Sequence, residues 1–479
     1  MATVSAIKHY PLFIGGEFVG TKHETTLHLP YDGTPVAQVS EGDEATMRQA
    51  ITAAQEGAQA MAAMTNAERS DMLLRLHAGM SAELADFARI ICDETGKPIK
   101  EARVEADRSL QTLLASAIEA RNLRGEVVPI DGAPSAKGKM AMTIREPLGV
   151  IGAITPFNVP LNTAMHKIGP ALAGGNAVVH KPSEETPLSA LRLAESMQRA
   201  GVPKGAYNVV CGDGATLGQQ LVADPNVAMI TFTGSVPVGK SIRAAAGLKR
   251  ATLELGSNCG LIIEPDADID LAVSRAVAGS FGHSGQLCIS VQRIYVHESI
   301  AGAFLAKFVA ATKKLQGGHP YDETTDYSSL ITEQAAIRVD EWIEEAISHG
   351  AKRLTGGPRK RATIAPTILE EVAPETKLAC QEVFGPVVAV NRYTDFDEAV
   401  RLTNNTPYGL QAGIFTRDLQ RAFDAARKLK VGGVMINEVP TFRADQMPYG
   451  GVKESGQGRE GPRYAIEEMT EMKLICWKI

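Results

Sequence analysis

One cysteine, Cys288, lies in a glycine-rich turn where a thiol could carry out chemistry. Before it, apolar residues recur at helical spacing over 269–281 behind an acidic cap, and after it the run 294–296 is typical of a strand. Gly282 and Gly285 allow the backbone to bend tightly between helix and strand, so the thiol could face a cleft. We interpret Cys288 as a catalytic nucleophile. The alternative is a small buried hydrophobic residue, which is the commoner fate of a lone cysteine.

The region before this turn alternates short apolar runs with helical patterns. The expected strands are 150–154, 177–180, 207–210, 229–231 and 252–255, and the expected helices are 161–172, 187–200, 215–221 and 238–245. Repeats of this kind predict a doubly wound parallel sheet that binds ligands at the carboxyl ends of its strands. The segments expected along that rim are 156–158, 181–184, 233–235 and 254–256.

The remaining segments extend this pattern at both ends. We expect a hairpin at Gly15-Gly16, then helices over 41–61, 67–95 and 98–123, and an exposed strand over 139–144 in a protruding hairpin. A second alternating region runs to about residue 448, with a helix over 333–349 and a strand over 433–437, which indicates a second α/β domain. The tail, 469–479, is expected to be a closing edge strand that pairs with the hairpin or with another subunit.

Composition narrows the functional classes. With 479 residues, 44% hydrophobic and 22% charged, the chain is expected to be a soluble globular protein of several domains. The net charge of −6 gives no electrostatic case for nucleic acid or a membrane surface, and no apolar run reaches transmembrane length. No secretory signal is visible. The six cysteines are scattered without metal-ligand spacing, so we expect reduced thiols, no metal and a cytoplasmic enzyme.

A Walker A pattern, GSVPVGKS at 234–241, follows an expected strand and precedes an expected helix. A nucleotide triphosphatase would also need a strand that ends in a magnesium-binding aspartate, and no clear candidate follows. The pattern occurs by chance in glycine-rich chains, so we give this alternative little weight. A glycine turn that leads into a helix still suits a pyrophosphate.

Several separated motifs resemble those of the aldehyde dehydrogenase superfamily, and together they cover nearly the whole chain. They are TPFNVPLN (155–162), GPALAGGNAVVHKPSEETPLSA (169–190), FTGSVPVGK (232–240), LELGSN (253–258), GQLCIS (285–290), EVFGPV (382–387) and PYGGVKESGQGREG (448–461). The segments VPVGK, CISVQR and VPTFRADQMPYGG are similar to those of lactaldehyde and phosphonoacetaldehyde dehydrogenases. The resemblance implies a Rossmann-like parallel-sheet dinucleotide domain, a second α/β catalytic domain and a small β oligomerisation hairpin.

The resemblance also implies catalytic roles. Cys288 would attack the aldehyde carbon, and the Asn158 amide and the Cys288 N–H would hold the oxyanion. Glu254 matches the general base that activates water to hydrolyse the thioester, although it could instead be a polar residue that caps a strand. Lys167 matches a lysine near the oxyanion network, and a solvated lysine is the alternative. His166 is expected to serve packing.

NAD is the implied cofactor. Lys181 and Glu184 match positions that hold the adenine-side ribose, Ser235 one near the pyrophosphate, and Glu382 and Phe384 ones that position the nicotinamide ribose and ring. A carboxylate at Glu184 accepts from ribose hydroxyls and repels a 2′-phosphate, so NADP is less expected. The other residues expected around the cofactor are Thr155, Pro156, Phe157, Ser183, Gly234, Leu255 and Gly256.

The substrate is less closely defined. Arg108 and Arg443 match regions that line the substrate funnel and could bind an anion, but each could instead form a surface or inter-domain ion pair. Leu287 stands where phosphonate- and phosphate-specific relatives tend to carry arginine, which disfavours those substrates. The other residues expected near the substrate are Ile289, Phe442 and Phe157. Ser257 replaces the usual second glycine of the LELGG motif.

We therefore expect an enzyme that oxidises a small hydroxylated or anionic aldehyde, such as lactaldehyde or a semialdehyde. An enzyme dedicated to phosphonoacetaldehyde or a sulfo-aldehyde is one alternative, and a noncatalytic scaffold that keeps the fold is another. The expected parts are a NAD-binding domain (1–122 and 146–256), a catalytic domain (257–448) and an oligomerisation element (123–145 and 466–479). The resemblance implies a homodimer or homotetramer, with strand 139–144 paired across a subunit boundary.

Overall fold

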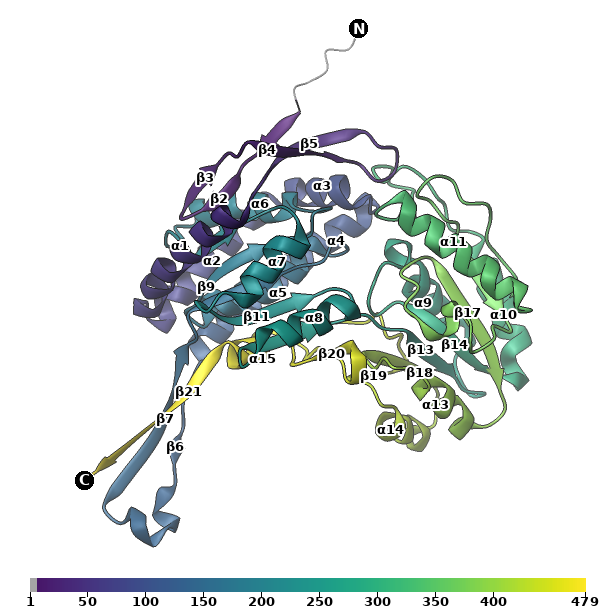
Figure 1. Cartoon of the computed structure of the whole chain (residues 1–479). Coiled ribbons are helices and arrows are strands. Elements are labelled where there is room, and N and C mark those ends of the chain that lie inside the picture. The colour runs from purple at the N-terminus through teal and green to yellow at the C-terminus, as the bar shows by residue number, and fades with distance from the viewer. Residues whose placement is uncertain (1–6) are drawn as a thin grey trace.

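Two large sheets, each with helices on its faces, form the body of the computed structural model, which describes residues 7–479 (Figure 1). The strands of the first sheet run in the order β20-β12-β11-β8-β9-β10-β2-β3. Its five central strands are parallel: β8 (Val150–Ile154), β9 (Ala177–Lys181), β10 (Tyr207–Val209), β11 (Val227–Thr233) and β12 (Arg250–Glu254). The predicted doubly wound sheet is therefore confirmed.

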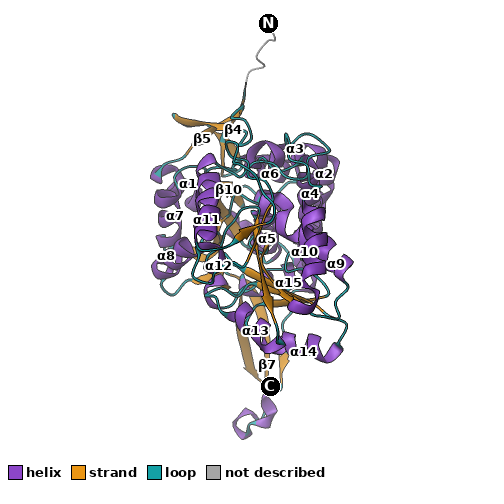
Figure 2. Ribbon diagram, turned by 90° about the vertical axis from the view of Figure 1, so that its right-hand side faces the viewer, coloured by secondary structure: helices purple, strands orange, loops and turns teal. Residues whose placement is uncertain are grey.

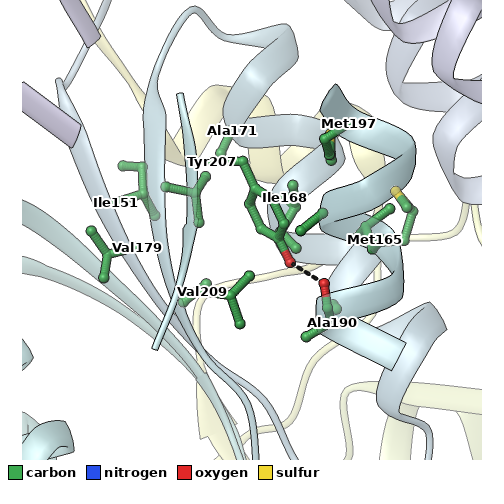
Figure 3. Close-up of a cluster of buried hydrophobic side chains, with 14 of the residues drawn as sticks. Ile151, Met165, Ile168, Ala171, Val179, Ala190, Met197, Tyr207 and Val209 are labelled. Atoms are coloured by element: carbon green, nitrogen blue, oxygen red, sulfur yellow. Dashed lines mark hydrogen bonds between the residues drawn. The ribbon is translucent and has the colours of Figure 1, made fainter. Parts of the chain in front are cut away.

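The connecting helices of the first sheet also lie where the apolar periodicity predicts them. They are α5 (Pro160–Ala173), α6 (Leu188–Arg199), α7 (Gly214–Ala223) and α8 (Val236–Ala246). Side chains of β8, β9 and β10 pack against α5 and α6 in a layer that includes Ile151, Val179, Ile168 and Met197 (Figure 3). This packing fixes the rim of the sheet at which β8, β9, β11 and β12 end.

The edges of the first sheet come from distant parts of the chain. The predicted N-terminal hairpin, β2 (Leu12–Ile14) and β3 (Glu17–Val19), pairs antiparallel with β10. At the other edge, β20 (Gly456–Gln457) pairs antiparallel with β12. A separate three-stranded sheet contains β1 (Lys8–Tyr10), β4 (His23–His28) and β5 (Pro35–Glu41).

The N-terminal helices differ from prediction at one point. Helices α1 (Glu44–Ala63) and α4 (Ile99–Asn122) form as expected, but the single helix predicted over 67–95 is wrong. It is divided into α2 (Asn66–Ala82) and α3 (Leu84–Thr95) at Glu83, whose φ of −117° and ψ of 19° are not helical. The Glu83 carboxylate accepts from Arg192 and Arg199 at 2.6 Å each. These ion pairs come from α6, so the periodicity of 67–95 contains no sign of the break.

The second sheet has the strand order β15-β16-β17-β14-β13-β18-β19. Its strands are β13 (Cys259–Ile263), β14 (Val291–His297), β15 (Lys352–Arg353), β16 (Thr367–Glu370), β17 (Val387–Tyr393), β18 (Gln411–Phe415) and β19 (Gly433–Ile436). Its helices are α9 (Ile269–Phe281), α10 (Glu298–Thr312), α11 (Glu333–Ser348), α12 (Lys377–Cys380), α13 (Phe396–Asn404) and α14 (Leu419–Lys428). The second α/β region is thus confirmed, with Cys288 between α9 and β14.

A three-stranded arm projects from the body on the side away from β4 and β5 (Figures 1 and 2). It consists of β7 (Lys139–Pro147) and the C-terminal β21 (Thr470–Lys478), and the short β6 (Val127–Val128) pairs with the other side of β7. The expectation that strand 139–144 pairs across a subunit boundary is wrong, because β7 has a partner on both sides within its own chain. Residues 466–468 complete helix α15 (Pro462–Glu468), so the arm strand begins only at Thr470.

Candidate active site

A cavity of about 530 Å³ lies between the two sheets, where the predicted strand ends meet the loop that carries Cys288. Two predicted site residues do not line it: Lys167 is buried behind the wall, and Phe442 is 43% exposed outside the cavity. The predicted residues that do line it are Arg108, Thr155, Pro156, Phe157, Asn158, Lys181, Ser183, Glu184, Gly234, Ser235, Glu254, Leu255, Gly256, Leu287, Cys288, Ile289, Glu382, Phe384 and Arg443. The structure therefore brings almost the whole predicted set into one cavity.

The backbone before Cys288 bends more sharply than expected. His283, Ser284 and Gly285 have φ values of 47°, 53° and 74°, whereas Gly282 has an ordinary φ of −54°. The bend is confirmed at Gly285, whereas Gly282, at the end of α9, has a φ that any residue can adopt, and two side-chain-bearing residues, His283 and Ser284, share the left-handed conformation. A Cβ atom at Gly285 would overlap the backbone of Gly385, so glycine is required there. The bend turns Cys288 toward the cavity.

The Cys288 thiol is partly exposed in the cavity and has a close neighbour. Its Sγ atom lies 2.9 Å from the Tyr449 hydroxyl oxygen. Burial raises the pKa of the thiol to about 12, and the hydrogen bond from Tyr449 opposes that rise. The resting site therefore holds a neutral thiol that must lose its proton before it can act as a nucleophile.

Glu254 is the last residue of β12, and its carboxylate is buried in the wall of the cavity. Neither of its oxygen atoms has a hydrogen-bond partner within residues 7–479, so Glu254 does not cap a strand. Burial raises its pKa well above the usual range, and the negative charge of Glu460 raises it further. A buried carboxylate without a partner, in the same cavity as a thiol, suits a base that takes a proton from water.

A buried charge cluster lies beside Glu254. Lys167 Nζ donates to Glu460 Oε1 at 2.6 Å and to the Thr231 hydroxyl at 3.2 Å, and Arg443 Nη2 lies 3.3 Å from Glu460 Oε2. Although burial raises it, the positive charges of Lys167 and Arg443 bring the pKa of Glu460 down to about 2. The interpretation of Lys167 as a solvated lysine is wrong, because its side chain is completely buried.

Asn158 is held from two sides on the loop after β8. Its Nδ2 atom donates to the Gln286 carbonyl oxygen at 2.7 Å, which leaves one amide hydrogen for another acceptor. The backbone carbonyl oxygen of Asn158 accepts from Lys97 Nζ at 2.9 Å. Lys97 pairs with Glu105 in the interior, and Glu105 Oε1 accepts from the Leu161 N–H at 3.0 Å. This buried pair fixes the backbone that carries the Asn158 amide.

A second polar cluster surrounds Asp445 at the outer part of the cavity. Asp445 accepts from Arg108 at 2.8 and 3.2 Å, from His166 Nε2 at 2.9 Å and from Asn162 Nδ2 at 3.1 Å. Burial raises the pKa of Asp445, but its contacts with His166 and Arg108 outweigh this effect and hold it below its usual range. Burial lowers the pKa of His166 to about 4, so a neutral imidazole faces the carboxylate. His166 thus lines the cavity and does not serve packing alone.

The opposite end of the cavity has the groups that a dinucleotide needs. Helix α8 begins after Ser235, whose side chain makes no capping hydrogen bond, and Pro237 has no N–H, so the N–H groups of Val236 and Val238 remain available to an anion. Glu184 Oε1 accepts from the Gly214 N–H at 2.5 Å and lies 3.4 Å from Lys181 Nζ, beside the rim. These groups fit a pyrophosphate and an adjoining ribose.

Nearer to Cys288, Glu382 accepts from the Ser257 N–H at 2.8 Å, and burial raises its pKa to about 7. A Cβ atom at Gly256 would collide with the Glu382 carboxylate, so the glycine makes room for it. The Phe384 ring meets the Phe157 ring edge-on at 5.7 Å. A carboxylate and two aromatic rings beside the thiol fit a second ribose and a planar ring.

The Walker A lysine does not take part in this site. Lys240 does not line the cavity, its side chain is 61% exposed, and its Nζ atom pairs with Glu454 Oε1 at 2.8 Å. The described residues, 7–479, also contain no group of three His, Cys, Asp or Glu side chains placed to hold a metal ion. Within the same residues, no helix is both long enough and apolar enough to span a membrane.

Residues 18–475 match the model of the aldehyde dehydrogenase family, and the chain belongs to that family. It is an NAD(P)-dependent aldehyde dehydrogenase by family, fold and full-length similarity. The sequence is 46% identical over 479 residues to a 3-sulfolactaldehyde dehydrogenase of Priestia aryabhattai, covering 99% of each chain. It is 40% identical over 468 residues to a lactaldehyde dehydrogenase of Methanococcus aeolicus, covering 97% of this chain and 99% of that one.

Solved structures agree over nearly the whole chain. Aldehyde dehydrogenase 21 from Physcomitrella patens, in complex with the reaction product succinate, gives a TM-score of 0.97 at 39% identity over 99% of both chains. The glyceraldehyde-3-phosphate dehydrogenase GapN of Methanocaldococcus jannaschii, complexed with NADP, gives 0.92 at 40% identity over 96% of this chain and 100% of that one. An NAD-dependent aldehyde dehydrogenase of Sinorhizobium meliloti gives a TM-score of 0.95 at 34% identity, over 98% of this chain and 95% of that one. Both coenzymes therefore occur among similar structures.

Several cavity contacts were not predicted. Tyr449 and Glu460 belong to the family motif PYGGVKESGQGREG, Asp445 belongs to the segment VPTFRADQMPYGG, and Lys97 lies in none of the motifs. The Tyr449 hydroxyl reaches Cys288 across 161 positions of sequence. The polar residues of PYGGVKESGQGREG could have been proposed as site residues, but their spacing does not indicate which side chains they contact.

Proposed function

We propose that the protein oxidises a small aldehyde with a hydroxylated or anionic far end to the carboxylate, with NAD preferred over NADP. The observation that carries this proposal is the common cavity of Cys288 and Glu254, in which the carboxylate has no partner within the described chain. A nucleophile and a free base in one enclosed space support covalent catalysis followed by hydrolysis. A noncatalytic scaffold has no need of an unpaired buried carboxylate, which costs stability.

The proposed chemistry begins when the Cys288 thiol releases its proton to water and the resulting thiolate attacks the aldehyde carbon. A C–S bond forms, and the carbonyl electron pair moves to the oxygen, which accepts from the free Asn158 amide hydrogen and the Cys288 N–H. When bound, the nicotinamide of NAD supplies the two-electron acceptor that the oxidation to a thioester requires. Glu254 then takes a proton from a water molecule, which attacks the thioester carbon and releases the carboxylate and the Cys288 thiolate.

The coenzyme would lie across the rim of the first sheet. The N-terminus of α8 would hold the pyrophosphate, Lys181 and Glu184 the adenine-side ribose, and Glu382 and Phe384 the nicotinamide end. NAD is proposed because the Glu184 carboxylate would face the 2′ position, where it accepts from a hydroxyl and repels a phosphate. The first sheet would then form the coenzyme domain, and the second sheet would carry the nucleophile.

The far end of the substrate would meet a positively charged surface. Arg443 lines the cavity and shares the ionised carboxylate of Glu460 with Lys167, which is buried behind the wall. The raised pKa of Glu254 favours its neutral form, so the positive charge of Arg443 is incompletely balanced. Arg108 lies further out with part of its side chain exposed. Similarity to the 3-sulfolactaldehyde dehydrogenase and to the succinate-bound aldehyde dehydrogenase 21 supports an anionic substrate. An enzyme dedicated to a sulfo-aldehyde or phosphonoacetaldehyde is the second candidate, favoured by these arginines.

We also propose a homodimer or homotetramer assembled through the arm. β21 is the outer strand of the arm sheet, and Met472, Leu474 and Trp477 are exposed along it. An exposed apolar edge strand normally finds a partner. Light scattering at micromolar concentration is expected to show a dimer or tetramer, and a monomer would contradict this proposal.

The activity is tested by following reduced nicotinamide with NAD or NADP while lactaldehyde, glycolaldehyde, succinic semialdehyde, phosphonoacetaldehyde and 3-sulfolactaldehyde are offered in turn. We expect turnover with NAD, abolished by Cys288→Ala and retained by Cys476→Ala, which removes an exposed thiol on the arm. If no aldehyde of the panel is oxidised, the noncatalytic scaffold is supported instead. Equal or better catalytic efficiency with NADP would contradict the NAD preference.

A further inference from the structure

The Tyr449 hydroxyl is the hydrogen-bonding side-chain partner of the Cys288 thiol. The two atoms, Oη and Sγ, lie 2.9 Å apart, and within residues 7–479 no other side chain is hydrogen-bonded to Sγ. Many nucleophilic cysteines are activated by a histidine or a cation. Here a phenol occupies that position.

Tyr449 is fixed in place from several directions. Its N–H donates to the Glu460 carbonyl oxygen at 3.0 Å, and its own carbonyl oxygen accepts from the Glu460 N–H at 2.7 Å. The Arg443 guanidinium lies over the ring, 3.7 Å from its centroid, and the side chain packs with Cys259, Ile289 and Leu410. The tyrosine is 4% exposed, so its hydroxyl cannot swing out to solvent.

We propose that Tyr449 is a catalytic residue that stabilises the Cys288 thiolate by donating its phenolic hydrogen to Sγ. This inference rests on the proposed role of Cys288 as nucleophile. The same donor would act twice, because the thiolate forms before attack on the aldehyde and forms again when the thioester carbon releases sulfur. Nothing in the resemblance to the family assigns this role to the hydroxyl.

The charges around Sγ show why such a donor matters. Burial opposes ionisation of the thiol, as do the Glu382 carboxylate and the neighbouring Cys259, whereas Arg443 favours it from behind the Tyr449 ring. A hydrogen bond to the charged form favours that form. Burial also raises the pKa of Tyr449 well above its usual range, so the phenol stays protonated and acts as a donor, not as a base. The cation over its ring polarises the hydroxyl further.

The direct test is the alkylation rate of Cys288 by iodoacetamide in the free enzyme, with Tyr449→Phe compared with the wild type. Phenylalanine keeps the ring, its packing and its contact with Arg443. A hydrogen bond to a charged group is equivalent to about one to two pKa units. Because a more basic thiolate is also more nucleophilic, the rate constant at a fixed mildly alkaline pH should fall about 3- to 15-fold.

Two comparisons separate this effect from general damage. Tyr295→Phe also removes a buried tyrosine hydroxyl, one that accepts from Arg293 Nη1 at 3.0 Å, and should leave the alkylation rate of Cys288 unchanged. The second variant places 3-fluorotyrosine at position 449, where a more acidic phenol donates more strongly. Its alkylation rate should exceed that of the wild type, whereas a merely structural tyrosine would leave the rate unchanged.

The outcomes also separate this inference from the proposed function. Wild-type alkylation rates in Tyr449→Phe, with Cys288 essential for turnover, would overturn the role of Tyr449 alone. Aldehyde oxidation that persists in Cys288→Ala would overturn the proposed function and the role of Tyr449 with it. Slower alkylation in Tyr449→Phe together with a lower kcat and an unchanged thermal midpoint would support both.

Discussion

Lys97 Nζ donates a hydrogen bond of 2.9 Å to the backbone carbonyl oxygen of Asn158, and in the same buried space it pairs with Glu105. Lys97→Met removes this donor and leaves the Glu105 carboxylate buried without a cation, which costs about 3–5 kcal/mol of stability. We expect a lower thermal midpoint and a lower kcat, because the Asn158 amide loses its support.

The double variant Lys97→Met, Glu105→Gln separates stability from catalysis. Glutamine removes the unpaired charge and can still accept from the Leu161 N–H through its amide oxygen. Most of the lost thermal stability should return, while kcat stays low. A double variant with wild-type kcat would show that Lys97 supports the fold only and does not position Asn158.

The pH dependence of turnover should reveal the electrostatic effect of Glu460 on Glu254. The pKa of Glu254 is raised, so this group is protonated at pH values below that pKa and becomes a base only above it. The rate of thioester hydrolysis should therefore rise with pH. Glu460→Gln removes the charge that raises the pKa of Glu254 while Lys167 and Arg443 continue to lower it, so the rising limb of kcat should move to lower pH. A limb that stays in place or moves upward would contradict this account.

Arg108 should discriminate between substrates. A hydrogen bond to a charged group is worth about 1.5–3 kcal/mol, so Arg108→Met should raise KM for 3-sulfolactaldehyde or succinic semialdehyde about 10- to 100-fold. Lactaldehyde, which has no charge at its far end, should be affected much less. The matched control is Arg103→Met on the same helix, which removes a surface pair with Glu323 and should change neither KM. Equal losses for charged and neutral aldehydes would assign Arg108 to its ion pair with Asp445 alone.

Glu184 should set the coenzyme preference. Glu184→Gln removes the negative charge but keeps an oxygen that can accept from the Gly214 N–H. We expect the ratio of kcat/KM for NADP to that for NAD to rise about tenfold, since repulsion of the 2′-phosphate is relieved. The measurement is initial rates with each coenzyme at saturating aldehyde. A ratio unchanged from the wild type would place the discrimination elsewhere in the cavity.

The sequence predicted most of the first sheet because its strands are short, apolar and separated by helices. Its edges could not be predicted in this way: β20 has only two residues, and β2 reaches β10 from near the start of the chain. The division between α2 and α3 falls at Glu83, whose ion-pair partners belong to another helix. By contrast, the pairing of the C-terminal strand β21 with the hairpin strand β7 was expected, although the two segments lie more than 300 positions apart. Local patterns specify elements, but these long-range pairings depend on packing.

The candidate site divides in the same way. Cys288, Asn158 and Glu254 could be named because each lies in a motif with its own chemistry. Tyr449 could not, because its role depends on one hydroxyl meeting one thiol in the folded chain. Phe442 was expected near the substrate from its position beside Arg443, but neighbours on an extended loop point in different directions, and only the arginine faces the cavity.

The central claim is that Cys288 carries the acyl group and Glu254 releases it. Glu254→Gln should still form the thioester but hydrolyse it slowly, so that one equivalent of reduced nicotinamide appears in a burst. Intact-protein and peptide mass spectrometry after mixing this variant with NAD and 3-sulfolactaldehyde, or whichever aldehyde the wild type prefers, should find the acyl group on the peptide that contains Cys288. A variant with full turnover and no adduct, or an adduct on another cysteine, would contradict the account.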